Sequence, residues 1–196
     1  MDLLTHAALG AAAAAAIAPA GRLRLAAAIG AAAALLPDVD ALIASRTDPL
    51  LTLEFHRHFT HALAFVPVGA LIAAALLRLA LRRRMAFASI YLYAFIGYLL
   101  SPLLDACTSY GTHLLWPFSE RPIALSIVPI VDPIFTLLIL IPLGLALRYR
   151  RAGVAWISLS GVSLMLVLRY AQHERALDVA QELAATRGHA AERMLV

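Results

Sequence analysis

The chain has 196 residues, of which 62% are hydrophobic and only 14% charged, and its mean hydropathy is +0.83. This composition leaves too little polar surface for a soluble domain of this size, so it predicts an integral membrane protein. The formal net charge is +4 at pH 7, but the arginines flank apolar runs, where they anchor helices against lipid headgroups. A nucleic-acid partner is therefore not expected.

Six apolar segments predict an all-α fold, a polytopic transmembrane helical bundle. In chain order they span residues 3–20, 23–36, 59–81, 85–104, 133–147 and 154–170. Because about 20 helical residues cross a bilayer, the second and fifth segments are short and are expected to be tilted or partly re-entrant. The first two segments are rich in alanine, which permits close helix packing, and we expect them to form a hairpin inside the bundle.

The last part of the chain is polar. Residues 171–196 are predicted to form a polar helical tail that follows a transmembrane bundle at residues 1–170. Gly188 is the expected stop of this tail helix. The sequence then becomes apolar again, as ERMLV, which favours a tail that begins a further C-terminal domain.

The arginines predict the orientation of the chain in the membrane. Nine of the sixteen lie in three gaps between apolar segments that contain no acidic residue. They are Arg22, Arg24, Arg78, Arg82, Arg83, Arg84, Arg148, Arg150 and Arg151. The positive-inside rule places these gaps in the cytoplasm. The remaining gaps, which hold most histidines and acids, then lie on the outer, periplasmic face.

Polar residues beside a membrane are energetically costly and are therefore candidates for function. They are predicted at one depth on the outer face, in the first segment, after the second, before the third, at the end of the fourth and before the fifth. In chain order they are His6, Asp38, Asp40, Glu54, His56, Arg57, His58, Thr60, His61, Asp105 and Asp132.

Imidazole and carboxylate groups are the usual ligands of Zn²⁺, Mn²⁺ and Fe²⁺. If the third segment is helical from about Glu54, His56 and Thr60 lie one turn apart, and His58 and His61 form a similar pair. A carboxylate such as Asp40 or Asp105 would complete a set in which the pKa of a bound water falls enough for hydroxide attack near neutral pH. This pattern predicts a divalent metal site.

The remaining polar side chains have predicted roles in catalysis. Arg57 is placed to hold an anionic group such as phosphate. Asp38 or Glu54 is a candidate general base. Together with the metal site, these roles predict hydrolysis of a phosphoester or a related bond.

Several of these residues also have a simpler structural explanation. A single helical histidine such as His6 is usually a packing residue, and Asp132 before Pro133 is typical of a helix N-cap. Asp38 after a proline is an ordinary turn residue, and His113 is typical of an interfacial position. The cluster of three histidines within six residues, beside several aspartates on the same face, nevertheless favours a metal or catalytic site.

Five motifs resemble the YdjM-like family of bacterial inner-membrane proteins, which are described as predicted metal-dependent hydrolases. The motifs are THAALG, LLPDVDALI, EFHRHFTHAL, LLDACTSYGTHLLWPFS and VDPIFTL, and they run from about Thr5 to Leu137. The resemblance implies the bacterial inner membrane as location and a divalent metal ion as cofactor, with zinc preferred to manganese or iron. The implied metal ligands are His6, Asp38 or Asp40, His56, His61, Asp105 and Asp132. A more distant similarity of the family to zinc-dependent phospholipases C implies a lipid headgroup as substrate.

The chain departs from the family pattern at one position. Family members carry a histidine four residues before the aspartate that corresponds to Asp105, and this chain has Ser101 there. Serine is a poor metal ligand, so this metal position is lost, filled by water, or supplied by His113.

The sequence therefore predicts a membrane-bound metal-dependent hydrolase that acts on a lipid or a periplasmic substrate. One alternative is a proton- or cation-coupled transporter, in which the same histidines and aspartates would form a relay. Against it, the polar groups cluster at one face and none lies deep in the membrane. A second alternative is a catalytically impaired structural membrane protein, which Ser101 favours.

Overall fold

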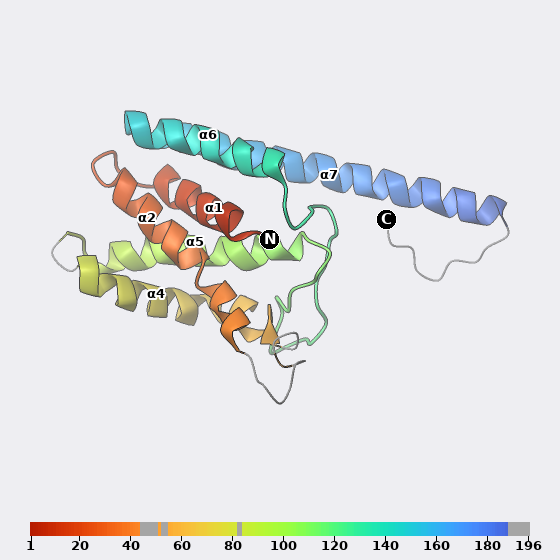
Figure 1. The fold of residues 1–196 in the computed structure, drawn as a ribbon, viewed down its shortest axis with the longest axis horizontal. Coiled ribbons are helices and arrows are strands. Elements are labelled where there is room, and N and C mark those ends of the chain that lie inside the picture. The colour runs from red at the N-terminus through yellow and green to blue at the C-terminus, as the bar shows by residue number, and fades with distance from the viewer. Residues whose placement is uncertain (44–50, 52–54, 82–83, 188–196) are drawn as a thin grey trace.

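The computed structural model describes residues 1–43, 51, 55–81 and 84–187, and these residues form an all-α bundle without a β-strand (Figure 1). This confirms the predicted fold class. The helices are α1 (Leu3–Ala16), α2 (Leu23–Ala34), α4 (Val66–Leu81), α5 (Phe87–Ala106), α6 (Pro133–Tyr149) and α7 (Ala152–Thr186), with the 3₁₀ helices η1 (Pro37–Leu42) and η2 (Phe59–His61).

Helix α1 lies at the centre of the bundle. It packs against α2, α5, α6 and α7, and 11 of its 14 residues are buried. Figure 1 shows α6 and α7 side by side on one side of α1 and α2, with α5 and then α4 on the other. The predicted hairpin of the two alanine-rich helices inside the bundle is therefore confirmed.

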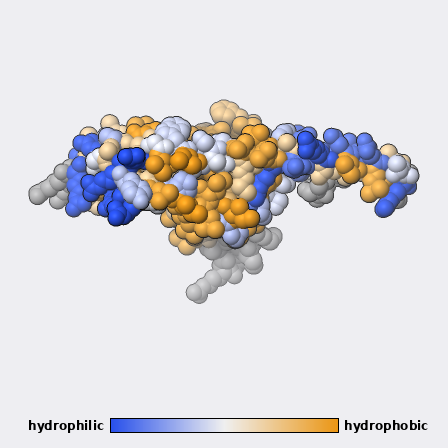
Figure 2. Space-filling model, turned by 90° about the horizontal axis from the view of Figure 1, so that it is seen from above, coloured by the Kyte–Doolittle hydropathy of each residue, from blue (hydrophilic) through white to orange (hydrophobic). Residues whose placement is uncertain are grey.

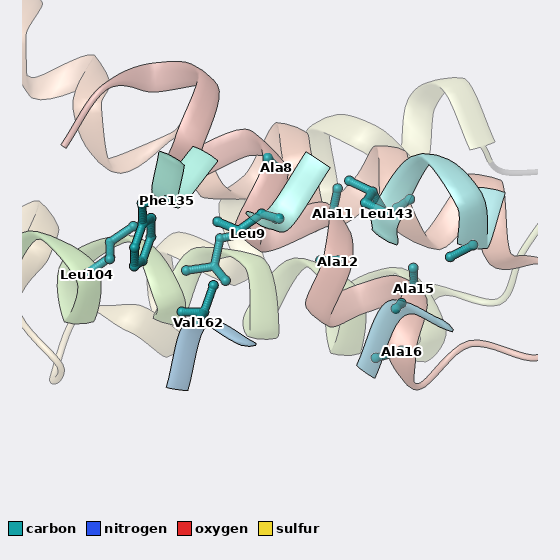
Figure 3. Close-up of a cluster of buried hydrophobic side chains, with 14 of the residues drawn as sticks. Ala8, Leu9, Ala11, Ala12, Ala15, Ala16, Leu104, Phe135, Leu143 and Val162 are labelled. Atoms are coloured by element: carbon teal, nitrogen blue, oxygen red, sulfur yellow. The ribbon is translucent and has the colours of Figure 1, made fainter. Parts of the chain in front are cut away.

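Small side chains on α1 let larger ones from three other helices approach it. Figure 3 shows the alanines of α1 and Leu9 facing Leu104 of α5, Phe135 and Leu143 of α6, and Val162 of α7. Phe135 is completely buried. This mixture of small and large side chains fills the interior on the side of α6 and α7.

On the other side of α1, three glycines bring three helix backbones into contact. A Cβ atom on Gly10 of α1 would lie 2.5 Å from the carbonyl oxygen of Gly30 in α2. A Cβ atom on Gly97 of α5 would lie 2.2 Å from the same oxygen. No side chain fits at these positions, so only glycine permits this close approach of α1, α2 and α5.

The helix lengths differ from the predicted segments. Within the described part of the chain, three stretches are long and apolar enough to cross a membrane, Leu23–Leu42, Phe87–Ala106 and Ala152–Thr186. Helices α1, α4 and α6 are shorter apolar helices of 14, 16 and 17 residues. The fifth segment is short, as predicted. The second segment forms a short α-helix of 12 residues, as predicted, and η1 then extends the apolar stretch to Leu42, because Pro37 fits the first position of a helical turn.

Helix α7 is continuous over 35 residues and crosses the predicted boundary at residue 170 without a break. Residues 162–187 contain neither glycine nor proline, so nothing local interrupts the helix there. The division into a bundle and a tail stays a prediction, and Gly188 lies outside the described residues.

The two ends of the bundle differ in character. Figure 1 shows that the ends of α1, α4 and α6 meet the starts of α2, α5 and α7 at one end of the molecule. The N-terminus, η1, η2 and the segment 107–132 lie at the other end. Figure 2 shows apolar side chains over the middle of one face and hydrophilic ones at one end and along the projecting part of α7. The chain thus separates its arginine-rich connections from its candidate site.

Candidate metal centre

The candidate site is assembled from two helices, two 3₁₀ helices and the turn at residues 56–57, at one end of the bundle. His6 lies one turn into α1, which Asp2 caps by accepting a hydrogen bond from Thr5 N at 3.0 Å. Asp105 lies in the last turn of α5, and the short helices η1 and η2 add further side chains. The structure brings together His6, Asp38, Asp40, His56, Arg57, His61 and Asp105.

His6, Asp38 and Asp105 form the centre of this cluster. Nδ1 of His6 is 3.0 Å from Oδ2 of Asp38, and its Nε2 is 3.2 Å from Oδ1 of Asp105. One ligand atom from each of the three residues lies within 4.8 Å of the others. Because an ion can bind only one nitrogen of the His6 ring, the three side chains would share a single ion only after one of these two contacts is replaced.

His61 adds a second imidazole to the centre. Its Nε2 is 3.2 Å from Oδ2 of Asp105 and 3.6 Å from Oδ1 of Asp38, while its Nδ1 is 3.2 Å from Oδ2 of Asp40. Burial alone would lower the pKa of His61, but the three carboxylates outweigh it and raise the pKa to about 10. A metal ion bound at Nε2 would have to displace that proton.

Three buried atoms of the cluster have no hydrogen-bond partner among the described residues. They are Nε2 of His6, Nε2 of His61 and Oδ2 of Asp105. Nε2 of His61 lies 3.2 Å from Oδ2 of Asp105, and Nε2 of His6 lies 3.2 Å from Oδ1 of the same carboxylate, so these contacts are ion pairs that lack hydrogen-bond geometry. A bound cation would satisfy all three, so the donor set fits a divalent metal ion.

Asp40 lies behind the centre and orients it. Its carboxylate accepts hydrogen bonds from the backbone N–H of Arg57 at 2.9 Å and from Oγ1 of Thr60 at 2.6 Å. Nδ1 of His56 is 2.8 Å from its Oδ1, and Nδ1 of His61 also contacts it. A carboxylate that holds one ring nitrogen of a histidine fixes the direction of the other, as is common around metal ligands.

The segment around His56 does not have the predicted helical form. Helix α4 begins only at Val66, and Arg57 has a φ of 60°, which is incompatible with a continuous α-helix. The predicted one-turn spacing of His56 and Thr60 is therefore wrong. Both side chains still face Asp40, because the turn wraps around that carboxylate.

Arg57 is buried and contacts the cluster directly. Its guanidinium lies 3.1 Å from Oδ1 of Asp105, donates to Oγ1 of Thr108 at 2.9 Å and stacks 4.9 Å from the ring centre of Tyr110. The Met1 ammonium also contacts Asp105. The sequence did not indicate Thr108 or Tyr110 as site residues, because TSYG is typical of an ordinary turn. The one signal that could have identified them is their position just after Asp105 in the chain.

Other predicted site residues have different surroundings. Asp132 caps α6 by accepting a hydrogen bond from Phe135 N at 3.0 Å, and it pairs with Arg169 of α7. Its role as a metal ligand stays a prediction, and the structure places it in contact with these two residues. Glu54, a candidate general base, lies outside the described residues.

The position of the expected histidine is occupied by Ser101. Its Oγ lies 3.2 Å from Nδ1 of His6, so the serine faces the cluster. His113 instead lies 3.4 Å from the carbonyl oxygen of Arg57, and its ring centre is 4.8 Å from that of His58. Its described contacts do not include the cluster of His6, Asp38 and Asp105.

Comparisons with known proteins give one family. Residues 1–176 match the model of a family described as YdjM inner membrane protein. A relative, the uncharacterized protein YfhP of Bacillus subtilis strain 168, is 25% identical over 123 residues, which are 63% of this chain and 37% of the relative. The matched part thus spans well under half of the length of that relative. No solved structure matches the chain.

Proposed function

The chain belongs to the YdjM family of inner membrane proteins, and from this premise we propose that it is a membrane-bound, metal-dependent hydrolase of a phosphoester or a related bond. The observation that supports this proposal most is the buried cluster of His6, Asp38 and Asp105, in which one ligand atom from each residue lies within 4.8 Å of the others. Such a donor set has the composition of a hydrolytic metal site.

We assign the ion to His6, Asp38, His61 and Asp105. The cluster contains three carboxylates, counting Asp40, against the guanidinium of Arg57 and the ammonium of Met1. The proton on His61 balances the remaining negative charge, and a divalent cation that replaced this proton would offset the same buried charge. An ion held there would supply a Lewis acid that polarises a phosphoryl oxygen.

His56 is the group that we assign to proton transfer. Its Nδ1 contacts Asp40 at 2.8 Å, which leaves Nε2 to accept or release a proton. Its side chain is 26% exposed, whereas those of His6 and His61 are fully buried. A substrate can therefore reach His56 more easily than it can reach the other two histidines.

Arg57 is assigned to the anionic group of the substrate. Its Nε has no hydrogen-bond partner among the described residues, although the rest of the guanidinium is held by Asp105 and Thr108. The Nε–H can therefore donate to a phosphoryl oxygen without breaking an existing hydrogen bond.

The test begins with the metal content of the detergent-purified protein, measured by plasma mass spectrometry. We expect about one equivalent of zinc, manganese or iron, since these ligands surround one position. Asp105→Asn and His61→Ala should lose it. Asp132→Asn is the matched control, because it changes an aspartate at the same end of the molecule that caps α6, and it should keep the metal.

Hydrolysis is then measured in proteoliposomes with a panel of phosphoester lipids and soluble phosphoesters. Release of product should stop when the metal is removed by a chelator and should return when zinc is restored. Absence of metal above background in the wild-type protein, or equal metal content in Asp105→Asn, would contradict the proposal.

A further inference from the structure

A pocket of about 250 Å³ lies beside the candidate metal centre, between η1, α4 and α5. We propose that it binds one hydrocarbon chain of a membrane lipid, whose phosphate-bearing headgroup then reaches the metal centre. The part of this inference that concerns the headgroup rests on the proposed function. The pocket itself is a separate structural feature and is tested separately.

The lining of the pocket is apolar except at one end. Its walls are formed mainly by Leu36, Val39, Ile43, Phe65, Ile72 and the ring of Tyr98. The polar atoms come from Asp40 and Thr60, which belong to the candidate site. The hydroxyl of Tyr98 is already used, because it donates to the carbonyl oxygen of Thr60 at 2.8 Å. A ligand for this pocket must therefore be a hydrocarbon over most of its length and polar at one end.

The open side of the pocket is surrounded by exposed apolar side chains. Val39 and Ile72, which line it, are 49% and 44% exposed, and Val68 and Leu71 on α4 are exposed to a similar degree. In a membrane protein, exposed apolar side chains on such a helix contact acyl chains. A chain can thus enter sideways from the bilayer, whereas a water-soluble substrate would leave this apolar volume empty.

The polar end of the pocket is one side chain away from the metal centre. Oδ2 of Asp40 is 3.2 Å from Nδ1 of His61, and Nε2 of the same ring is 3.2 Å from Oδ2 of Asp105. A headgroup attached to a chain in the pocket would therefore lie within a few atoms of His56, Arg57 and the proposed ligands. At about 30 Å³ for each water-sized group, the volume accommodates a chain segment of roughly eight such groups.

The test uses vesicles of phosphatidylcholine that contain a phosphatidic acid with a photoactivatable diazirine in one acyl chain. After irradiation, labelled residues are mapped by mass spectrometry and normalised to labelling of the lipid-exposed face of α7. We expect enriched labelling of η1 and of the α4 and α5 residues that line the pocket. An excess of unlabelled phosphatidic acid should reduce it, and soluble glycerol 3-phosphate should not.

Ile72→Trp and Leu71→Trp form the matched pair of variants. Ile72 lines the pocket, whereas Leu71 is equally exposed on the same helix but is not part of the lining. An indole at position 72 displaces about two methylene groups of the chain, and we expect pocket labelling to fall about tenfold. Leu71→Trp should label like the wild type, as should Ile72→Ala, which enlarges the pocket.

Equal labelling of Ile72→Trp and Leu71→Trp, or competition by glycerol 3-phosphate, would overturn the proposal. Loss of labelling in Ile72→Ala would also overturn the proposal. The alanine enlarges the pocket, so the loss of labelling in Ile72→Trp could not then be explained by the indole filling it. Asp105→Asn separates this proposal from the hydrolase proposal. We expect that variant to lose metal and to keep pocket labelling, since Asp105 does not line the pocket.

Discussion

Asp105 is the residue on which most contacts of the candidate centre converge. Its carboxylate lies within 3.2 Å of His6, Arg57 and His61, which come from three separate segments of the chain. It is completely buried. Removing the charge of Asp105 would leave the guanidinium of Arg57 and the ammonium of Met1 without this counterion in the interior. A substitution at Asp105 should therefore weaken both metal binding and the stability of the fold.

Ser101 offers a test of the metal centre that adds a ligand instead of removing one. Because Ser101 Oγ is 3.2 Å from Nδ1 of His6, an imidazole at position 101 would reach the cluster. We expect Ser101→His to bind zinc about tenfold more tightly than the wild type, as when one ligand or its support is restored. Calorimetric titration of the metal-free protein measures this change.

The matched control for this prediction is His113→Ala. His113 contacts Arg57 and His58 and not the cluster, so its removal should leave zinc affinity within about twofold of the wild-type value. If His113→Ala lowered the affinity as much as Asp105→Asn does, His113 would be a ligand.

The sequence singled out side chains that the structure brings together, but it did not predict their arrangement, and their roles stay predictions. His6, Asp38, His61 and Asp105 were all identified because charged and imidazole groups are costly beside a membrane. The turn at Arg57 could not be predicted, because its backbone N–H is held by Asp40, 17 residues away in the chain. A tertiary hydrogen bond of this kind overrides local helical spacing.

At the scale of the helices, three glycines control how closely α1, α2 and α5 pack. Gly30 is the central one, because its carbonyl oxygen would meet a Cβ atom on either Gly10 or Gly97. The alanine-rich composition indicated close packing. The sequence could not identify these contacts, because no local feature distinguishes the buried Gly30 from Gly144, which is exposed on α6.

Gly30→Ala should destabilise the protein. Alanine in place of glycine inside a helix normally adds roughly 0.5–1 kcal/mol of stability. At Gly30 the new Cβ would lie 2.2 Å from the carbonyl oxygen of Gly10, and forcing two backbones apart costs roughly 1–3 kcal/mol. Thermal unfolding in detergent measures the difference. The control is Gly144→Ala, where no atom lies within 4 Å; equal melting temperatures would show that the close contact is unimportant.

Helices α6 and α7 are joined at their site end by Asp132 and Arg169. Burial alone would raise the pKa of Asp132, but the hydrogen bond from Phe135 N and the ion pair with Arg169 outweigh it, so the pKa lies below its ordinary value of 3.8. The ionised carboxylate therefore contributes its full stabilisation when the pH is above the ordinary pKa of 3.8. This stabilisation is lost as the pH falls through the lowered pKa of the folded state.

Asp132→Asn isolates this contribution, because asparagine is an equally good N-cap and lacks the charge. Above about pH 5 the wild type should be more stable than the variant by a few tenths of a kcal/mol to about 1 kcal/mol. The difference should shrink below about pH 4. Melting temperatures measured from pH 7 to pH 3 provide the comparison, and a difference that stays constant over this range would contradict the ion-pair assignment.

At the scale of the whole molecule, α7 is too long to lie entirely within a bilayer. Its 35 residues span about 52 Å at about 1.5 Å per residue, whereas the hydrocarbon core is about 30 Å thick. Figure 1 shows its C-terminal part projecting beyond the bundle at the end where η1 and η2 lie. We therefore expect the polar turns of this helix to lie outside the membrane on the same side as the candidate site.

The orientation of the molecule is tested with single cysteines in a Cys107→Ser background. Phe118 is 88% exposed at the site end, and Arg150 is exposed in the arginine-rich connection between α6 and α7. We expect a membrane-impermeant maleimide to label Phe118→Cys in intact cells and Arg150→Cys only after permeabilisation, in line with the positive-inside rule. The reverse pattern would place the site in the cytoplasm.

The contact between the three glycines also has an evolutionary consequence. Gly10 follows His6 by four residues, Gly30 precedes Asp38 by eight, and Gly97 precedes Asp105 by eight. The helices that carry or lead to the proposed ligands thus touch through main-chain atoms. Changes of side chains cannot bring these helices closer together. A donor atom can therefore be exchanged in this chain, as in Ser101→His, while the separation between these three helix backbones stays the same. Diversification toward another ion would then proceed by replacing donor atoms and not by resizing the site.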